Sequence, residues 1–186
     1  MKKLAAMLIA LVILTGCTGK GNEMDRAMGL RAALLGSEGC TFTAHLCADY
    51  GDELHEFTLY CEGKNSGDLG FRVEEPESIE GITGRFQGEK GELTFDDMAV
   101  AFPLLADGQV TPVSGPWILL KTLLGGYLTA CNQEGDLLHL TISDSYAEDA
   151  LQLEIWLDGE DRPVQAEILY GGRRILTMEI ENFQIL

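Results

Sequence analysis

The sequence predicts a mainly β (α+β) domain in which one large antiparallel sheet or barrel takes up most of the chain. Two observations predict it. From residue 40 onward, short segments of alternating apolar and polar side chains follow one another, separated by glycines and charged turn residues. One strongly apolar helical segment interrupts them after the sixth strand, and five more strands follow it. Regular short strands with turns between them are typical of such sheets and barrels.

The first 16 residues have the pattern of a secretory signal peptide. Lys2 and Lys3 precede an apolar run from residue 4 to 14, which is shorter than the roughly 20 residues that a membrane-spanning helix needs. The run ends in Leu14-Thr15-Gly16-Cys17, which resembles the lipobox of bacterial lipoproteins. The resemblance implies cleavage before Cys17 and acylation of that cysteine, including a palmitate-type chain. An ordinary signal peptide, or a short membrane helix with a chance cysteine, is the alternative.

This N-terminus predicts three segments: a signal peptide at 1–16, a lipidated cysteine with a polar tether at 17–22, and one folded domain at 23–186. The chain of 186 residues has a net charge of −17, which becomes −19 once Lys2 and Lys3 are removed with the signal peptide. So acidic a domain argues against nucleic-acid binding and against lying flat on an anionic membrane. We expect a monomer that is held at the extracytoplasmic face of the cell membrane through Cys17.

The domain begins with a predicted helix at 22–36. Its apolar residues recur at spacings of three and four, so that most of them should share one buried face. Gly36 would end the helix. The apolar residues of this pattern are Met24, Ala27, Met28, Leu30, Leu34 and Leu35.

Strand patterns follow, beginning with a hairpin of residues 40–50 and 53–61. A tight turn would place Phe42 opposite Cys61 and Leu46 opposite Phe57, with the apolar sets on one side. Cys40 is then a diagonal neighbour of Cys61, which makes this pair the favoured disulfide. Buried free thiols are the alternative, and the four cysteines after Cys17 allow three full pairings.

The remaining strands are expected at 69–74, 79–86, 92–96 and 98–102, and then at about 128–131, 137–144, 151–158, 164–170 and 174–183. Between the two groups, Pro116 can occupy the first position of a helix that runs through residues 117–124 to Gly125. This helix is apolar nearly all round, so both of its sides should contact something other than water.

The order of helix, six strands, helix and five strands resembles the LolA/LolB-like lipoprotein-carrier fold. Residues 71–82, 93–97 and 180–183 are also similar to segments of uncharacterised lipoproteins from Gram-positive gut bacteria. The resemblance implies an incompletely closed antiparallel barrel of about eleven strands, with an N-terminal helix and an inserted helix that lids its open side.

The resemblance also implies a hydrophobic ligand, an acyl chain, lipid or lipidated protein, in the hollow of the half-barrel. The lid would supply Trp117, Leu120 and Leu124. The expected lining from the sheet is Phe42, Leu46, Phe57, Leu59, Phe71, Val73, Leu93, Phe95, Val100, Phe102, Leu138, Leu140, Leu153, Ile155, Ile168, Leu176 and Met178. Because the chain is tethered, transfer to or from the membrane or sensing fits it better than long-range shuttling. The alternative is that these residues form a filled core, and that the protein is a tethered interaction or envelope-signalling domain without a lipid ligand.

Catalytic patterns are missing from the sequence. It contains no Gly-x-Ser-x-Gly, no His-Glu-x-x-His and no phosphate-binding glycine loop, so we predict neither an enzyme nor a cofactor. His45 and Cys47 share a strand face and His55 comes near in one register, but paired-cysteine spacing is lacking, and no metal site is predicted.

Overall fold

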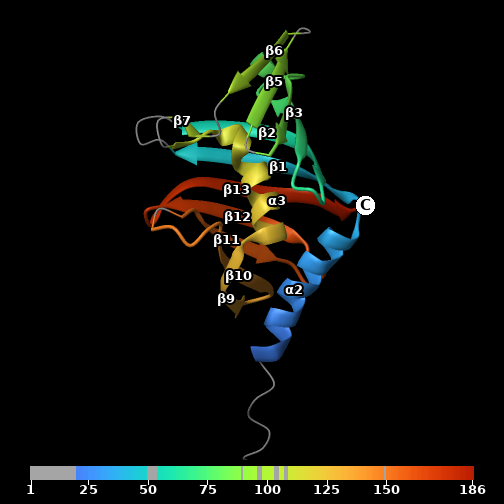
Figure 1. Cartoon of the computed structure of the whole chain (residues 1–186), viewed down its shortest axis with the longest axis vertical. Helices are drawn as coiled ribbons and strands as arrows, with labels where there is room; N and C mark the ends of the chain where they lie inside the picture. Colours follow the sequence, from blue (N-terminus) through green and yellow to red (C-terminus); the bar gives the residue numbers. More distant parts are fainter. Residues whose placement is uncertain are drawn as a thin grey trace, which may run out of the picture.

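The structure is a computed structural model that describes residues 20–49, 54–88, 90–95, 98–102, 105–106, 109–148 and 150–186. Side chains are described at 22–48, 54–88, 90–94, 111–148 and 150–186. An 11-stranded antiparallel sheet dominates these ranges (Figure 1). The helix α2 (Lys20–Gly36) precedes the sheet, and the helix α3 (Gly115–Gly125) lies against one of its faces.

The first six strands precede α3. They are β1 (Gly39–Asp49), β2 (Leu54–Lys64), β3 (Leu69–Glu75), β4 (Thr83–Gln87), β5 (Lys90–Phe95) and β6 (Met98–Phe102). A small hairpin of β7 (Leu105–Ala106) and β8 (Gln109–Val110) and the short helix η3 (Pro112–Ser114) lead into α3. After it come β9 (Tyr127–Glu134), β10 (Leu137–Ser143), β11 (Gln152–Leu157), β12 (Pro163–Tyr170) and β13 (Arg173–Ile185).

The strand order is β6-β5-β4-β3-β2-β1-β13-β12-β11-β10-β9. The sheet is therefore two meanders joined along β1 and β13. Within the described residues no hydrogen-bonded pair joins β6 to β9, so the barrel stays open, and β7, β8 and α3 connect these two edges. This confirms the predicted order of helix, six strands, helix and five strands.

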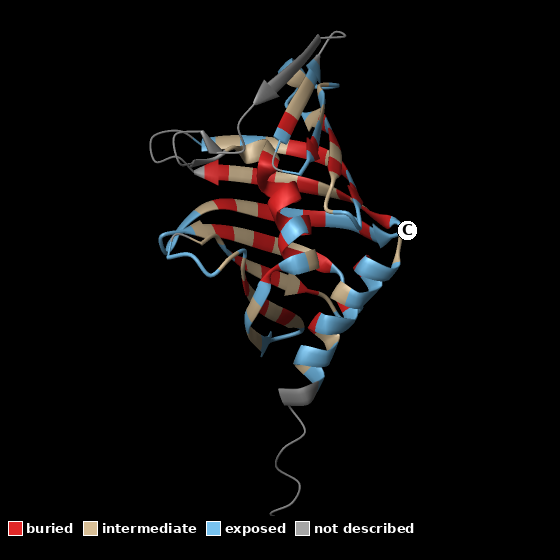
Figure 2. Ribbon diagram, viewed as in Figure 1, coloured by how far each residue is buried: buried red, intermediate tan, exposed pale blue. Residues whose placement is uncertain are grey.

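The first hairpin has the predicted register. Phe42 pairs with Cys61 and Leu46 pairs with Phe57. Alternate residues of β1 are buried, from Phe42 at 1% exposure to Ala48 at 0%, because they point to the face of the sheet that α3 covers. We call this the inner face. Figure 2 shows the resulting buried band across the strands and along α3.

One local prediction is wrong, and one small hairpin was missed. The strand expected at 79–86 begins only at Thr83, because residues Glu77–Ile79 form the short helix η2 and Gly81 takes a φ of 84°, which ends extended structure. The hairpin of β7 and β8 was not expected, since each of its strands has only two residues.

The predicted disulfide between Cys40 and Cys61 is also corrected. The four cysteines of the described chain are free thiols. Cys40 pairs with Gly63 and Cys61 with Phe42, so the two cysteines are diagonal neighbours as expected. Diagonal Cβ atoms are typically about 7 Å apart, wider than the ~4 Å that a disulfide spans.

The helix α2 buries less than its sequence pattern predicts. Its buried apolar residues are Ala27, Leu30 and Leu34, whereas Met24 and Met28 are 42% and 47% exposed. Only one narrow side of the helix faces the sheet. Neither helix of the described chain has the length and apolar character that crossing a bilayer requires.

Candidate functional site

The space inside the half-barrel is occupied by α3. The helix contacts β2 and β3 of one meander and β10 of the other. The fully or almost fully buried residues of the predicted lining lie in this one apolar core, and they are Phe42, Leu46, Leu59, Phe71, Val73, Trp117, Leu120, Leu138, Leu140, Leu153, Ile155, Ile168, Leu176 and Met178. We call them, with the other buried apolar residues around α3, the inner core.

The inner core is tightly closed on the side of the second meander. Leu138, Leu153, Ile155 and Met178 each have 0% of their surface exposed, which leaves no space for a water-sized molecule beside them. Phe57, Leu93 and Leu124 are only partly buried and pack against its margin. The predicted lining residues Phe95, Val100 and Phe102 lie outside the residues whose side chains are described.

Sequence explains why α3 can fill the space. Pro116 stands in its first turn, where the missing N–H costs no hydrogen bond. The buried residues of the helix are Gly115–Leu120, Thr122 and Leu123. The predicted all-round burial is thus confirmed. The exceptions are Lys121 and Gly125, which are exposed, and Leu124, which is partly buried. The ammonium of Lys121 lies 5.0 Å from the centre of the Trp117 ring.

Polar contacts hold both ends of α3. At the N-terminal end, the indole Nε1 of Trp117 donates a hydrogen bond to the carbonyl oxygen of Gly67 at 3.0 Å. The same ring stacks on Phe86 at a centroid distance of 5.6 Å. At the C-terminal end, Arg31 of α2 donates from Nε to the carbonyl of Leu123 and from Nη2 to those of Thr122 and Gly126. We call this contact the Arg31 cap.

The Arg31 cap binds carbonyl groups at the C-terminal end of α3, of which that of Thr122 also accepts from the backbone N–H of Gly126. The last carbonyls of a helix lack intrahelical donors and lie at the negative end of its dipole. A guanidinium suits them, because its several N–H groups fan out in one plane. Burial lowers the pKa of Arg31 from its ordinary value.

Glycines allow α3 to approach the sheet closely. A Cβ atom on Gly63 of β2 would lie 2.6 Å from Cδ2 of Leu120. At the start of the helix, a Cβ on Gly115 would lie 3.0 Å from Cδ2 of Leu176. The close contact between α3 and the sheet therefore depends on glycines, which have no Cβ atom at these two positions.

Sequence reasoning missed the polar groups around the site. Arg31 stands within the predicted N-terminal helix, and its spacing alone does not reveal that it reaches a helix some 92 residues later. Gly63 falls just outside the predicted strand 53–61, although the alternation of β2 continues to Lys64. Extending that alternation would have placed Gly63 on the inner face.

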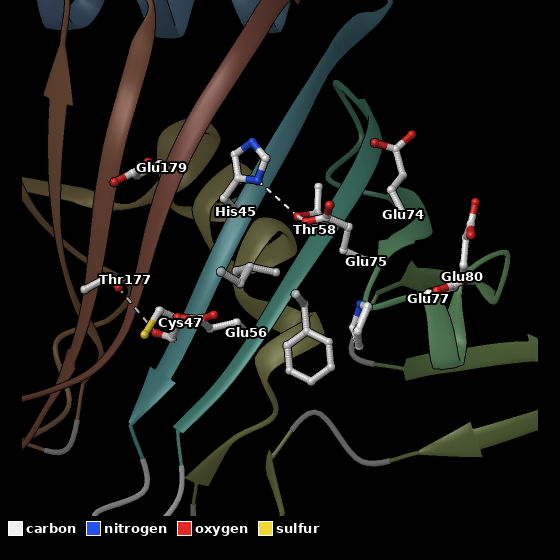
Figure 3. A pocket seen from close by; sticks show the side chains of 13 residues that line it. His45, Cys47, Glu56, Thr58, Glu74, Glu75, Glu77, Glu80, Thr177 and Glu179 are labelled. Atoms are coloured by element: carbon white, nitrogen blue, oxygen red, sulfur yellow. Dashed lines mark hydrogen bonds between the residues drawn. The ribbon is translucent and has the colours of Figure 1, made fainter.

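A cavity of about 720 Å³ lies outside the inner core, over β1, β2, β13 and the segment that follows β3 (Figure 3). We call it the outer groove. Among its lining residues no lysine or arginine occurs, and six are glutamates: Glu56, Glu74, Glu75, Glu77, Glu80 and Glu179. Such a wall repels the carboxylate of a fatty acid and the phosphate of a lipid headgroup.

Histidine and cysteine residues of the outer groove form no metal site. Nδ1 of His45 lies 3.1 Å from the hydroxyl of Thr58, and Thr58 donates to Glu75 at 2.8 Å. Among the described residues there is no group of three or more histidine, cysteine, aspartate or glutamate side chains placed to hold a metal ion.

The fold thus defines a half-barrel whose apolar inner face is covered by the helix α3. No protein-family model matches the chain, and no curated protein matches it either. Similar solved structures include a LolA superfamily protein from Nitrosomonas europaea, at 10% identity and a TM-score of 0.43, covering 86% of this chain and 93% of that one.

Two further solved structures are similar over most of this chain. A putative outer membrane lipoprotein-sorting protein domain from Vibrio parahaemolyticus is 9% identical, with a TM-score of 0.45 and coverage of 89% of this chain and 92% of that one. Lipoprotein LppX from Mycobacterium tuberculosis is 13% identical, with a TM-score of 0.41 and coverage of 87% and 93%. The element order of this chain confirms the predicted incompletely closed barrel with an N-terminal helix and an inserted helix, and each likeness concerns the fold alone.

Proposed function

We propose that the protein is a membrane-anchored extracytoplasmic lipoprotein that takes an acyl chain onto its inner face when α3 moves aside. The observation that carries the proposal is the nature of the closure. The space is filled by one apolar helix at the open edge of the sheet, and Trp117 and the Arg31 cap supply its polar contacts to other elements.

Displacing α3 would uncover a continuous apolar surface. The sheet side chains beneath it, such as Leu59, Leu140 and Ile168, are apolar and almost fully buried. A saturated chain could replace the contacts that α3 makes, because the hydrophobic effect is non-directional and scales with the apolar area covered. The structure then represents the arrangement in which α3 covers the inner face.

A second function is favoured by the tight packing of the inner core. Residues with 0% exposure, among them Leu153 and Met178, leave no preformed cavity next to them. In that case the half-barrel is a rigid scaffold, and the protein is a tethered interaction or envelope-signalling domain that binds no lipid. The two functions differ in whether α3 can leave.

The test is native mass spectrometry on the mature chain with Cys17→Ser, which removes the anchor. The expected result is an extra mass of several hundred daltons that organic extraction removes, or uptake of an added fluorescent fatty acid. Arg31→Gln should increase the uptake because it weakens the closure. A ligand-free mass and no uptake by either form would overturn lipid binding and leave the scaffold function.

The anchor is tested on the unaltered chain. Peptide mass spectrometry of the membrane fraction should find an N-terminal peptide that begins at Cys17 and carries acyl chains. Cys17→Ser should release the protein from the membrane.

A further inference from the structure

One side of α2 exposes apolar side chains around Arg31, whose own guanidinium turns to the end of α3. Met24, Met28 and Leu35 are 42%, 47% and 51% exposed, and they lie on one side of the helix, since they are spaced by four and seven residues. From residue 27 to 36 the only charged side chain is Arg31, in a chain whose net charge is −17. We call Met24, Met28 and Leu35 the α2 stripe.

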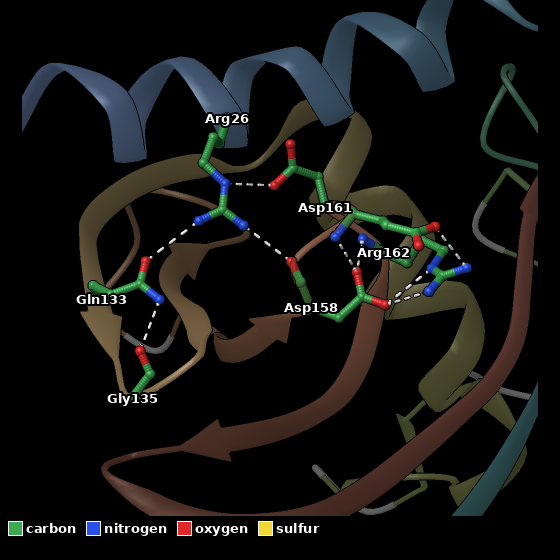
Figure 4. A network of polar contacts seen from close by, with 7 residues as sticks. Arg26, Gln133, Gly135, Asp158, Asp161 and Arg162 are labelled. Carbon is green, nitrogen blue, oxygen red and sulfur yellow. Dashed lines mark hydrogen bonds and ion pairs between the residues drawn. The ribbon is translucent and has the colours of Figure 1, made fainter.

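Contacts of its two arginines with the domain fix the orientation of α2, and in this orientation Met24, Met28 and Leu35 are exposed. Nε of Arg26 lies 2.6 Å from Oδ1 of Asp161, and its Nη2 donates to the carbonyl oxygen of Asp158 at 3.0 Å (Figure 4). A third contact, from Nη1 to Oε1 of Gln133, spans 3.3 Å. Both arginine side chains of α2 therefore bind the rest of the domain, Arg26 through these contacts and Arg31 through the Arg31 cap.

The chain before α2 indicates what covers the stripe. The helix begins at Lys20, three residues after Cys17. Three residues reach at most about 11 Å, so an acylated Cys17 holds the start of α2 at the level of the lipid headgroups. Met24 follows about 6 Å further along the helix axis and Met28 about 12 Å, at a rise of 1.5 Å per residue.

We propose that the α2 stripe rests on the bilayer surface beside the lipid anchor, so that α2 is the membrane-contact element of the protein. The inference rests on the anchoring at Cys17 proposed above. A helix with one apolar side lies in the plane of the interface with that side toward the acyl chains. Glu23 and Asp25 flank the stripe, so the contact is shallow and favours uncharged lipids.

A second copy of the chain fits the stripe less well. Stable protein interfaces bury about 800 Å² per partner, and three half-exposed side chains fall well short of that area. The membrane needs no matching partner surface, and a helix that starts next to an acyl anchor meets it at high local concentration.

The native methionines report on this contact. Dilute hydrogen peroxide converts exposed methionine to its sulfoxide, and peptide mass spectrometry gives a rate for each site. The lipidated chain on phosphatidylcholine vesicles is compared with the Cys17→Ser chain in solution. We expect Met24 and Met28 to oxidise several-fold more slowly on vesicles, while Met178, which is 0% exposed, stays slow in both.

Two variants make the result specific. Leu54→Met places a reporter at a position that is 61% exposed, at the far end of the hairpin of β1 and β2 from α2, and its rate should not change. Met28→Glu puts a charge into the stripe and should return the oxidation rate of Met24 on vesicles toward its solution value, although the lipid still anchors the chain.

Flotation separates this inference from the anchor on which it rests. A chain that does not float with the vesicles overturns both. A chain that floats but oxidises Met24 and Met28 at the solution rate overturns the α2 contact and keeps the anchor. Slow oxidation that depends on the concentration of the Cys17→Ser chain in solution would assign the stripe to a second copy instead.

Discussion

Nε of Arg31 on α2 donates a hydrogen bond to the carbonyl oxygen of Leu123 in the last turn of α3, at 2.7 Å. The contact joins the first described helix, α2, to the helix that fills the half-barrel. Nη2 of Arg31 also donates to the carbonyl oxygen of Gly126, at 2.9 Å. One side chain therefore caps the C-terminal end of α3 and connects it to α2.

Arg31→Ala should therefore loosen α3. The substitution leaves partly buried carbonyls without a donor, and an unsatisfied buried acceptor costs about 1–3 kcal/mol. We expect denaturant unfolding to show a loss of free energy in that range. Uptake of a fluorescent fatty acid should increase in the same variant, if the inner face takes acyl chains.

The matched control is Arg72→Ala. Arg72 is 54% exposed and pairs with Glu74 at 3.0 Å on the surface, so its loss should change stability by less than about 0.5 kcal/mol. Equal unfolding curves for Arg31→Ala and Arg72→Ala would show that the Arg31 cap does not hold α3.

The sheet could be predicted from the sequence because its signal is local and regular. The pairing of Phe42 with Cys61 follows from alternation plus a short turn, and both features are visible within about twenty residues. The side of α2 that faces the sheet could not be predicted in the same way. A helix with apolar residues on more than one side has several ways to pack, and contacts of Arg26 with Asp161 and of Arg31 with Leu123 select one.

Whether the inner face is an open groove or a filled core could not be predicted from the sequence either. Alternation identifies Leu140 and Ile155 as inward-facing, but the same pattern describes an open groove and a filled core. What decides between them is how closely α3 approaches, and that depends on Gly63 and Gly115, where a side chain is missing. Contacts between residues so far apart in the chain leave no repeating pattern in the sequence.

Thiol reactivity should divide the four cysteines of the folded domain into two pairs. Burial raises the pKa of Cys40 to about 11, although a hydrogen bond involving the backbone of Gly63 works against it, and burial raises that of Cys61 well above its usual range. Since the thiolate is the reactive form, neither should be alkylated at pH 8. Cys47 and Cys131 are only partly buried.

The measurement is iodoacetamide labelling of the Cys17→Ser chain, followed by peptide mass spectrometry. Labels should be found at no more than Cys47 and Cys131 in the folded protein, and at all four positions in denaturant. Rapid labelling of Cys40 or Cys61 under native conditions would contradict the closed packing of the hairpin at that point.

Acid should loosen the turn on which α2 rests. Burial works to raise the pKa of Asp158, but hydrogen bonds from the backbone N–H and the guanidinium of Arg162 and from the backbone of Glu160 outweigh it, so the pKa lies below its ordinary 3.8. A carboxyl with a lowered pKa stabilises the fold above pH 3.8, and this stabilisation is lost as the pH falls through the folded-state value.

Amide hydrogen exchange in the turn tests this effect, because the N–H groups of Glu160 and Arg162 both donate to Oδ1 of Asp158. After correction for intrinsic rates, their protection should fall between pH 5 and pH 3. Asp158→Asn cannot titrate, so its protection should be lower at pH 5 and change little over the same range. A parallel fall in both proteins would assign the effect to other acidic groups.

The fit of α3 against β2 predicts that a single methyl group at position 63 is harmful. A Cβ there would lie 2.6 Å from Cδ2 of Leu120, so the helix or the leucine must shift. Overpacking of this kind typically costs about 1–3 kcal/mol. Gly63→Ala should lower the free energy of unfolding accordingly, whereas Gly70→Ala should be nearly neutral, because the nearest atoms to a Cβ at that position are 4.0 Å away.

A double-mutant cycle attributes this loss to the helix itself. Leu120→Ala alone leaves a cavity in the inner core and should cost about 2–5 kcal/mol. In the Gly63→Ala background the clash disappears with the leucine, so the second substitution should cost measurably less than it does in the unaltered chain. Strict additivity of the two changes would mean that Leu120 can move away from β2 freely, and that α3 is not seated on Gly63.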